Sequence, residues 1–134
     1  MRKSLIAILL VTLACSGDST GPTQSSVAGT WNLQTINGAA LPFVVAQTGA
    51  NKVEITGDVL TVTNSGSFTE ITTIRTTQNG ASTTQTVPDA GTYVLNGNNV
   101  TFQFQSDGSV GSGTVSGGTL TVSQTGLSLI YKKS

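Results

Sequence analysis

Apolar and polar residues alternate along most of the chain from Val27 onward, and no stretch sustains the period of about 3.6 residues that an amphipathic helix requires. The clearest run is residues 100–105, where Val, Phe and Phe alternate with Thr, Gln and Gln. Such alternation is typical of a strand with one face in the core and the other in water. Turn-forming pairs such as Asn79-Gly80 separate successive runs. The pattern therefore predicts an all-β domain of about eight to ten short antiparallel strands over residues 27–134.

The order of these runs predicts a meander, in which each strand pairs with its neighbours in the sequence. Every strand needs partners for its backbone N–H and C=O groups, and the outer strands of an open sheet lack them on one side. A meander of this length removes both edges when it closes into a small barrel. A two-sheet β-sandwich is the alternative.

Four segments stand apart from this regular pattern. Residues 39–49 are the least strand-like and predict a loop, or a short helical turn after Pro42. Gly57-Asp58 predicts a turn between two strands, and residues 88–91 break the run that precedes Tyr93. Residues 76–86 have no large apolar side chain, so we expect the hairpin that they form to project into solvent with both faces polar.

Residues 1–14 have the composition of a secretory signal peptide. Arg2 and Lys3 give a positive start, residues 5–13 are continuously apolar, and the small residue Ala14 precedes Cys15. The apolar run of about nine residues is far shorter than the roughly 20 that a membrane-spanning helix needs. Because residues 16–26 are polar, we expect residues 15–26 to form a flexible tether to the domain.

The residues Thr12-Leu13-Ala14-Cys15 resemble the lipobox of bacterial lipoproteins, although that signal usually has Leu where this chain has Thr12. The resemblance implies that the leader is removed and that Cys15 becomes the mature N-terminus, with acyl chains such as palmitate anchoring it to the cell envelope. Ser16 after the cysteine implies, by the same resemblance, the outer membrane, facing the periplasm or the exterior. An ordinary secretory leader followed by an accidental cysteine is the alternative.

Charge and composition exclude several classes of function. Without the leader, four basic residues stand against six acidic ones, a net charge of about −2, which leaves no basic patch for nucleic acid. Cys15 is the only cysteine and there is no histidine, so Cys-His and Ser-His nucleophile pairs and His-containing zinc sites are excluded. Nothing in the sequence suggests a metal or another cofactor.

The acidic residues do not predict catalysis. Glu54 and Asp58 flank a predicted turn and Asp107 lies in another, so we interpret them as solvated acids rather than as the paired carboxylates of a glycosidase. We therefore expect that the protein is not an enzyme.

Gly29-Thr30-Trp31 opens the first predicted strand, and Tyr131-Lys132-Lys133 closes the last. These features resemble the Gly-x-Trp start and the basic end of lipocalins and of small bacterial lipocalin-like domains. The resemblance implies that Gly29, Trp31 and a basic residue, Lys132 or Lys133, plug one end of a lipocalin-like barrel, with the cation over the indole ring. The family usually has Arg at the basic position, and its mid-chain Asp-x-x-Tyr-like motif has only a loose match from Asp89 to Tyr93.

The candidates for a ligand pocket are one acid and four aromatic residues of the predicted strands: Phe68, Glu70, Tyr93, Phe102 and Phe104. The aromatic residues, like Phe43 and Tyr131, have the alternative role of filling the core, which we favour. Strand parity puts Glu70 on the same face as Phe68, which would place a carboxylate inside the barrel. A β-bulge at Ile71 would instead leave Glu70 in water, and this is the interpretation that we favour.

Two functional hypotheses of different classes follow. The first is a lipid-anchored envelope protein whose lipocalin-like barrel binds a small apolar ligand. The second is a non-catalytic structural or protein-interaction module of the envelope, with a filled core and residues 76–86 as its contact surface. An envelope inhibitor or stress-associated domain of sandwich type is a third reading. The state of the interior, open or full, separates the first two.

Overall fold

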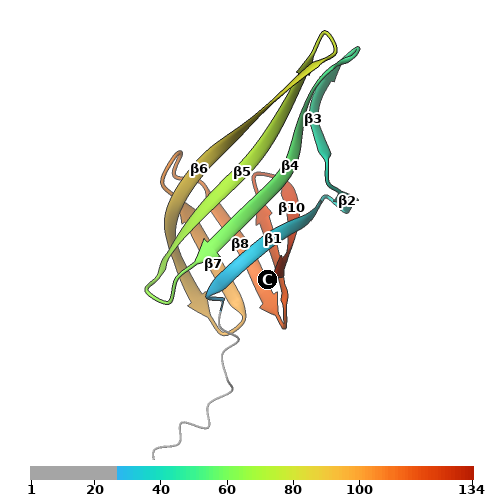
Figure 1. The fold of residues 1–134 in the computed structure, drawn as a ribbon. Helices are drawn as coiled ribbons and strands as arrows, with labels where there is room; N and C mark the ends of the chain where they lie inside the picture. The colour runs from blue at the N-terminus through green and yellow to red at the C-terminus, as the bar shows by residue number, and fades with distance from the viewer. Residues whose placement is uncertain (1–26) are drawn as a thin grey trace, which may run out of the picture.

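The computed structural model describes residues 27–134, where the regular structure is entirely β (Figure 1). Ten strands follow one another along the chain: β1 (Gly29–Ile36), β2 (Ala39–Ala40), β3 (Phe43–Thr48), β4 (Asn51–Val62), β5 (Ser67–Gln78), β6 (Ala81–Asn96), β7 (Asn99–Phe104), β8 (Val110–Ser116), β9 (Thr119–Gln124) and β10 (Leu127–Lys133). No helix long and apolar enough to cross a membrane occurs in this part of the chain.

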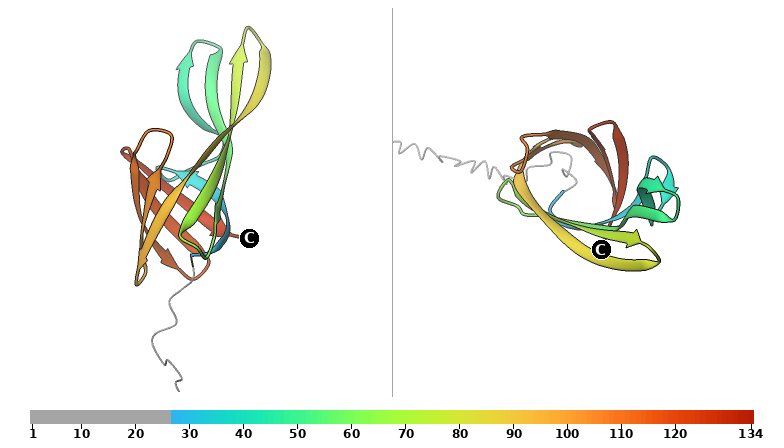
Figure 2. Two further views of the ribbon diagram at one scale, coloured as in Figure 1. Left: turned by 90° about the vertical axis from the view of Figure 1, so that its left-hand side faces the viewer. Right: turned by 90° about the horizontal axis from the view of Figure 1, so that it is seen from above.

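Eight of these strands close into an antiparallel barrel. From β4 to β10 each strand pairs with the next, and β1 joins the two ends of this series by pairing with β10 on one side and β4 on the other. The closed ring is visible when the molecule is seen from above (Figure 2). The predicted meander closed into a lipocalin-like barrel is confirmed, and the sandwich alternative is excluded.

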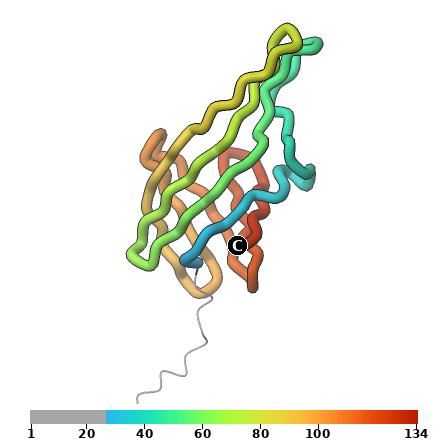
Figure 3. The backbone as a smooth tube through the Cα atoms, viewed as in Figure 1, coloured from blue at the N-terminus to red at the C-terminus, as the bar shows by residue number. Residues whose placement is uncertain are grey.

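Three strands of the barrel wall continue beyond its rim. With β3, their outer parts form what we call the projecting sheet: β3, residues 51–55 of β4, residues 74–78 of β5 and residues 81–87 of β6 (Figures 2 and 3). Residues 78–88 are exposed throughout, so the predicted polar hairpin does project into solvent. The prediction of a loop or helical turn over residues 39–49 is wrong, because most of that segment pairs as β2 with β1 and as β3 with β4.

Two predicted breaks are also absent from the structure. Gly57-Asp58 lies within β4 rather than in a turn, because the chain accommodates one extra residue there as a bulge between Ile55 and Gly57. Pro88 lies within β6, opposite Ile71. Since β7 pairs with β6 only from Gly91 onward, residue 88 has an open edge on that side, which is where a strand tolerates proline.

The first and last strands seal one end of the barrel. Trp31 is completely buried, and its Nε1–H donates to the Val27 carbonyl oxygen at 2.8 Å. The Lys133 Nζ lies 5.3 Å from the centre of the indole ring. The Lys133 side chain passes so close to Gly29 that a Cβ there would lie 2.6 Å from its Cε, and Gly29 also has a φ of +135°. Glycine therefore suits this position chiefly because a residue with a Cβ adopts this φ only with strain, and such a residue would also displace the Lys133 side chain.

The basic partner of Trp31 is Lys133, so its assignment to Lys132 is wrong. Side chains alternate between the two faces of a strand, and Tyr131 points into the barrel. Lys133 therefore lies on the inner side, opposite Trp31 in the β1–β10 register, whereas Lys132 points outward and donates to Thr119 Oγ1 at 2.6 Å.

Candidate functional site

The end of the barrel opposite Trp31 contains a cavity of about 190 Å³. Ile36 and Leu129, paired at the far end of the β1–β10 register from Trp31 and Lys133, contribute to its wall. The lining is mainly aliphatic, with a few polar groups: Leu33, Ile36, Ile55, Leu127 and Leu129, then Asp58, Glu70, Thr72, Gln124 and Thr125. An aliphatic wall with few polar groups is the usual composition of a small-molecule site.

Two carboxyl groups meet at this cavity on the side of the barrel core. The hydroxyl of Tyr131, a residue only 1% exposed, lies 3.5 Å from Asp58 Oδ2 and 3.4 Å from Glu70 Oε1. Thr72 Oγ1 donates to the same Asp58 Oδ2 at 3.3 Å. Because one phenolic proton serves two carboxyl groups, Tyr131 satisfies only one of them at a time.

The β4 bulge decides which acid faces the cavity. In a regular strand Glu54 and Asp58, four residues apart, would point to the same side. The extra residue between Ile55 and Gly57 reverses the alternation, so Asp58 points into the barrel with Leu60, and Glu54 points outward. The interpretation of Asp58 as a solvated turn acid is therefore wrong: its residue is 8% exposed.

Glu70 reaches the interior because β5 is regular around it. The β5–β6 register is unbroken from Ser67 to Gln78, and the β4–β5 register is unbroken from Gly57 to Val62. The favoured bulge at Ile71 is absent, and the placement of Glu70 in water is wrong. Strand parity alone, which puts Glu70 on the face of Phe68, gives its true orientation.

Burial changes the protonation of this cluster. Burial first, and then the negative charge of Glu70, raise the pKa of Asp58 to about 8. The pKa of Glu70 is also raised, mainly by burial, with a further contribution from Asp89. Burial raises the pKa of the Tyr131 hydroxyl, which stays protonated as a donor. Near neutral pH the two carboxyl groups therefore share a proton.

Hydrogen bonding within the cluster is incomplete. Oδ1 of Asp58 is fully buried and receives no hydrogen bond from any donor in residues 27–134. A buried oxygen without a donor is unfavourable, and such groups are concentrated at functional sites. The donor that this oxygen lacks is either the proton held by the carboxyl pair or a group outside the described residues.

Glu54, an acid on the other face of β4, differs from Asp58 because cationic side chains neutralise its charge. Its carboxylate accepts a hydrogen bond from Arg75 Nε at 2.9 Å and forms an ion pair with Lys52 Nζ at 3.0 Å. These side-chain hydrogen bonds, from Lys52 and then Arg75, lower the pKa of Glu54. The carboxylate of Glu54 is shielded from solvent by the side chains of Lys52 and Arg75. Glu54 thus forms ion pairs with two cations, whereas no ion pair in residues 27–134 involves Asp58.

The aromatic candidates lie away from this cavity. Phe68 packs edge-on against Phe102 and Phe104, with ring centres 5.2 and 5.0 Å apart. A side chain at Gly91, opposite Phe68, would overlap the Phe68 ring and the Gln103 carbonyl oxygen, so this glycine makes room for the aromatic cluster. These three rings fill the core, as the favoured interpretation had it.

Tyr93 also lies outside the cavity. It is half-buried, its ring centre is 6.3 Å from that of Phe102, and its hydroxyl donates to the Thr63 carbonyl oxygen at 2.5 Å. Of the five predicted pocket residues, Glu70 is the one that lines the cavity. The aliphatic lining was missed, although Leu127 and Leu129 share a face with Tyr131 in the sequence pattern.

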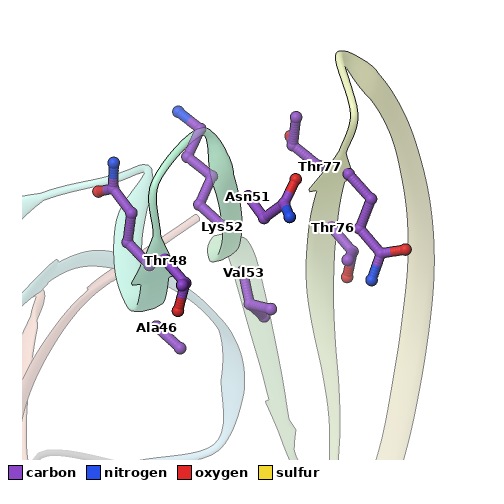
Figure 4. Close-up of a pocket in the computed structure, with 9 residues that line it drawn as sticks. Ala46, Thr48, Asn51, Lys52, Val53, Thr76 and Thr77 are labelled. Atoms are coloured by element: carbon purple, nitrogen blue, oxygen red, sulfur yellow. The ribbon is translucent and has the colours of Figure 1, made fainter.

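Other recesses in residues 27–134 lie on the surface. One of about 160 Å³ lies in the projecting sheet, between β3, β4 and β5 (Figure 4). All of its lining residues, Val53 and Thr76 among them, are exposed or half-buried. Another lies over β5 and β6 at residues 69–71 and 88–90, in contact with residues 105–106. The described residues contain no group of three or more acids, histidines or cysteines that could hold a metal ion.

Comparison with known proteins identifies a matching family, and solved structures that are similar to the chain. A family model described as a lipocalin-like domain matches residues 27–122. No curated protein matches the sequence. Among solved structures, the crystal structure of Echinococcus granulosus fatty-acid-binding protein 1 is similar at 12% identity, over 80% of this chain and 96% of that chain, with a TM-score of 0.34. The strand pairing and the family match define the fold.

Proposed function

Because this chain belongs to the lipocalin-like domain family, we propose that it is a non-catalytic protein that binds a small, largely apolar ligand in the open end of its barrel. The observation that carries the proposal is the cavity of about 190 Å³ lined by Leu33, Ile36 and Leu129, at the end opposite the Trp31 plug. One end of the barrel is sealed by the chain itself, and the other end has a lined recess.

The size of the cavity sets the size of the ligand. A dry aliphatic cavity of about 150 Å³ accommodates a benzene ring. We therefore expect a body of roughly six to ten non-hydrogen atoms, smaller than a long-chain lipid. The ceiling for the most efficient small ligands is about 1.5 kcal/mol per non-hydrogen atom, and larger ligands gain about 0.3. With an intermediate gain of roughly 0.5–1 kcal/mol per atom, a body of about eight atoms gains about 4–8 kcal/mol, which corresponds to dissociation constants between about 1 mM and 1 μM.

A fragment titration tests this function. The mature chain from residue 15 onward, with Cys15→Ser, is titrated with benzyl alcohol while backbone amide signals are followed by NMR. We expect saturable shifts at Ile36 and Leu129, which line the cavity. Leu127→Trp fills the half-buried rim and is expected to abolish binding, and Val94→Trp, at a position 69% exposed, is the matched control. Absence of saturable shifts across a panel of benzene-sized fragments up to millimolar concentration would contradict the proposal.

The second candidate function is a protein-interaction module with a filled interior. Two features favour it: the tight packing of Phe68, Phe102 and Phe104, and the open outer edges of β3 and of residues 81–88 of β6. Unpaired strand edges are available for pairing with another chain. Failure of the whole fragment panel to bind would favour this module over the binding protein.

We also propose that acylated Cys15 anchors the protein at the bacterial cell envelope, with the outer membrane as the site. The leader, Cys15 and the tether lie outside the residues that the structure describes, so this proposal depends on the sequence pattern of residues 1–26. The described chain begins at Val27, beside Trp31, so the tether would join the sealed end of the barrel. The cavity and the projecting sheet would then face away from the membrane.

Membrane fractionation tests the anchor. In the bacterial host, Cys15→Ala is expected to release the protein from the membrane fraction, because acyl chains on residue 15 would be the attachment. Ser16→Ala is the control and should leave the protein in that fraction. A Cys15→Ala protein that remains as firmly membrane-bound as the parent would refute the anchor without affecting the proposal for the cavity.

A further inference from the structure

The cavity contains more negative charge than an apolar ligand would require. Asp58 and Glu70 both line it, and burial of a carboxylate next to aliphatic side chains is costly unless a partner compensates for it. No lysine or arginine belongs to its lining. The cations of residues 27–134 are engaged elsewhere: Lys52 and Arg75 with Glu54, Lys132 with Thr119, and Lys133 with Trp31. Residues 27–134 therefore supply no cation as the countercharge.

A second observation points to a missing donor. Asp58 is more than nine-tenths buried, it lines the cavity, and its Oδ1 is unpartnered. The groups around the pair are hydroxyls and acids. Thr72 donates to Asp58 Oδ2, Tyr131 donates to either Asp58 or Glu70, and Asp89 adds negative charge near Glu70. A ligand that carries N–H donors and a positive charge would complement both the oxygen and the charge.

On the premise that the cavity binds a small apolar molecule, we propose that this molecule is a small organic amine, whose ammonium group lies against Asp58 and Glu70 and whose apolar body packs on Leu33, Ile36 and Leu129. An ammonium group has three N–H donors, enough to serve the carboxyl groups of Asp58 and Glu70 together. The aliphatic wall beyond the two acids matches a compact hydrocarbon body. The two carboxyl groups alone do not provide the six to eight oxygen ligands that Ca²⁺ takes, roughly, in proteins.

Binding of the amine exchanges one cation for another. Near neutral pH the carboxyl pair holds about one proton, so it has one negative charge. The incoming ammonium replaces that proton, which leaves to solvent, and the cavity with its ligand again carries one net negative charge. Amine binding should therefore release about one proton, whereas an alcohol of the same shape should release none.

Calorimetric titration with matched ligands tests the inference. Benzylamine and benzyl alcohol have nearly the same shape and differ in charge, and both are titrated at pH 7.5 into the Cys15→Ser mature chain. We expect benzylamine to bind at least about tenfold more tightly, because hydrogen bonds to charged groups are the stronger ones. Repeating the titration in buffers with different heats of ionisation measures the proton released.

Two variants test whether the preference for benzylamine depends on Asp58 and Glu70. Asp58→Asn with Glu70→Gln keeps the shape of the protonated pair and removes its charge, so it should abolish the preference for amine and the proton release. The affinities of the variant for benzylamine and benzyl alcohol should become equal within about threefold. A well-dispersed backbone amide NMR spectrum shows independently that the variant is folded. Glu54→Gln removes an acid from the opposite face of the same strand and should change neither ligand's affinity.

The outcomes separate the two proposals. Equal affinities for amine and alcohol, or an amine preference that survives in the double variant, would overturn the amine inference and leave the binding function standing. Binding of neither ligand, by the parent protein or by the variants, would remove the binding function and the amine inference with it. A preference that depends on Asp58 and Glu70 and releases a proton supports both.

Discussion

The same two strands, β1 and β10, contribute to both ends of the barrel. The two ends differ in how completely their buried polar groups are hydrogen-bonded. At the sealed end, Trp31 faces Lys133, and the indole N–H has a carbonyl acceptor in Val27. At the open end, Ile36 faces Leu129 beside a cavity in which an Asp58 oxygen has no donor. At the sealed end the buried indole N–H has an acceptor, whereas at the open end a buried carboxyl oxygen has no donor among the described residues.

This difference separates residues that stabilise the fold from residues available for function. Natural proteins keep local features that oppose stability chiefly at sites of function. Two neighbouring, largely buried acids oppose stability, whereas an aromatic plug whose N–H is hydrogen-bonded supports it. Substitutions at the two ends should therefore change the free energy of unfolding by different amounts and, for the acids, in the opposite direction.

The largest effect is expected from the plug. Trp31→Ala removes a completely buried indole and leaves a large cavity, so we expect the free energy of unfolding to fall by about 3–5 kcal/mol. Leu127→Ala, at the half-buried rim of the open end, should cost only about 1 kcal/mol. Urea denaturation measures both. Equal losses at the two ends would break the comparison.

The next effect is a pH dependence of the free energy of unfolding that arises from Asp58 at the open end. The folded pKa of Asp58, about 8, lies above its ordinary value of 3.8, so the folded state binds the proton more tightly than the unfolded state. The contribution of Asp58 to stability should therefore be greatest at low pH and fall by up to roughly 5 kcal/mol as the pH rises from about 4 to 8. Asp58→Asn should flatten this profile and be more stable than the parent at pH 8, as measured by urea denaturation at a series of pH values.

Glu54 supplies the control for this profile, because its pKa is shifted in the other direction. Its pKa is lowered by Lys52 and Arg75, so its contribution is present above pH 4.5 and is lost as the pH falls below that value. Glu54→Gln should therefore leave the loss of stability between pH 5 and 8 intact. A profile that disappears in Glu54→Gln and persists in Asp58→Asn would contradict the assignment.

A smaller effect tests how the plug is assembled. Gly29→Ala should lower stability by about 1–2 kcal/mol, because the new Cβ meets the Lys133 side chain and the φ of +135° is strained for alanine. In a double-mutant cycle, Lys133→Ala should relieve part of this cost. Lys132→Ala, on the outer face, should relieve none. Strictly additive effects of Gly29→Ala and Lys133→Ala would show that the close approach does not matter.

The smallest effect belongs to the projecting sheet. Arg75→Gln breaks an ion pair in which the arginine side chain is 37% exposed, so we expect a loss below about 1 kcal/mol that shrinks further in high salt. Thermal unfolding at low and high ionic strength measures it. A loss as large as that of Trp31→Ala would mean that the barrel depends on the projecting sheet.

Local pattern was sufficient to predict the strands, and the resemblance to lipocalins added the closed barrel and its plug. The alternation in residues 100–105 predicts β7 because it depends on residues close in sequence, whereas the sealed end at Gly29–Trp31 followed from the family resemblance. Parity likewise places Glu70 inside. Identification of Lys133 over Lys132 needed only the alternation from Tyr131 carried to the end of the strand.

The orientation of the β4 acids and the location of the cavity depended on strand register and tertiary packing, which the local sequence pattern does not reveal. A single inserted residue in β4 reverses the faces of Glu54 and Asp58, and nothing in the surrounding residues distinguishes a bulge at Thr56 from a turn at Gly57. Inward-facing aromatic residues look the same whether they fill a core or line a pocket. Only the packing of Phe68 over Gly91 shows that these rings fill the interior and that the cavity lies elsewhere.

The pairing of β1 with β10 also governs when the domain can fold. Trp31 lies opposite Lys133, so the first and last strands of the barrel come from opposite ends of the described sequence. The ring therefore stays open until these two distant segments meet. Because contacts between residues far apart in sequence cost the most loop-closure entropy, we expect closure to follow the formation of the neighbouring hairpins from β4 to β10.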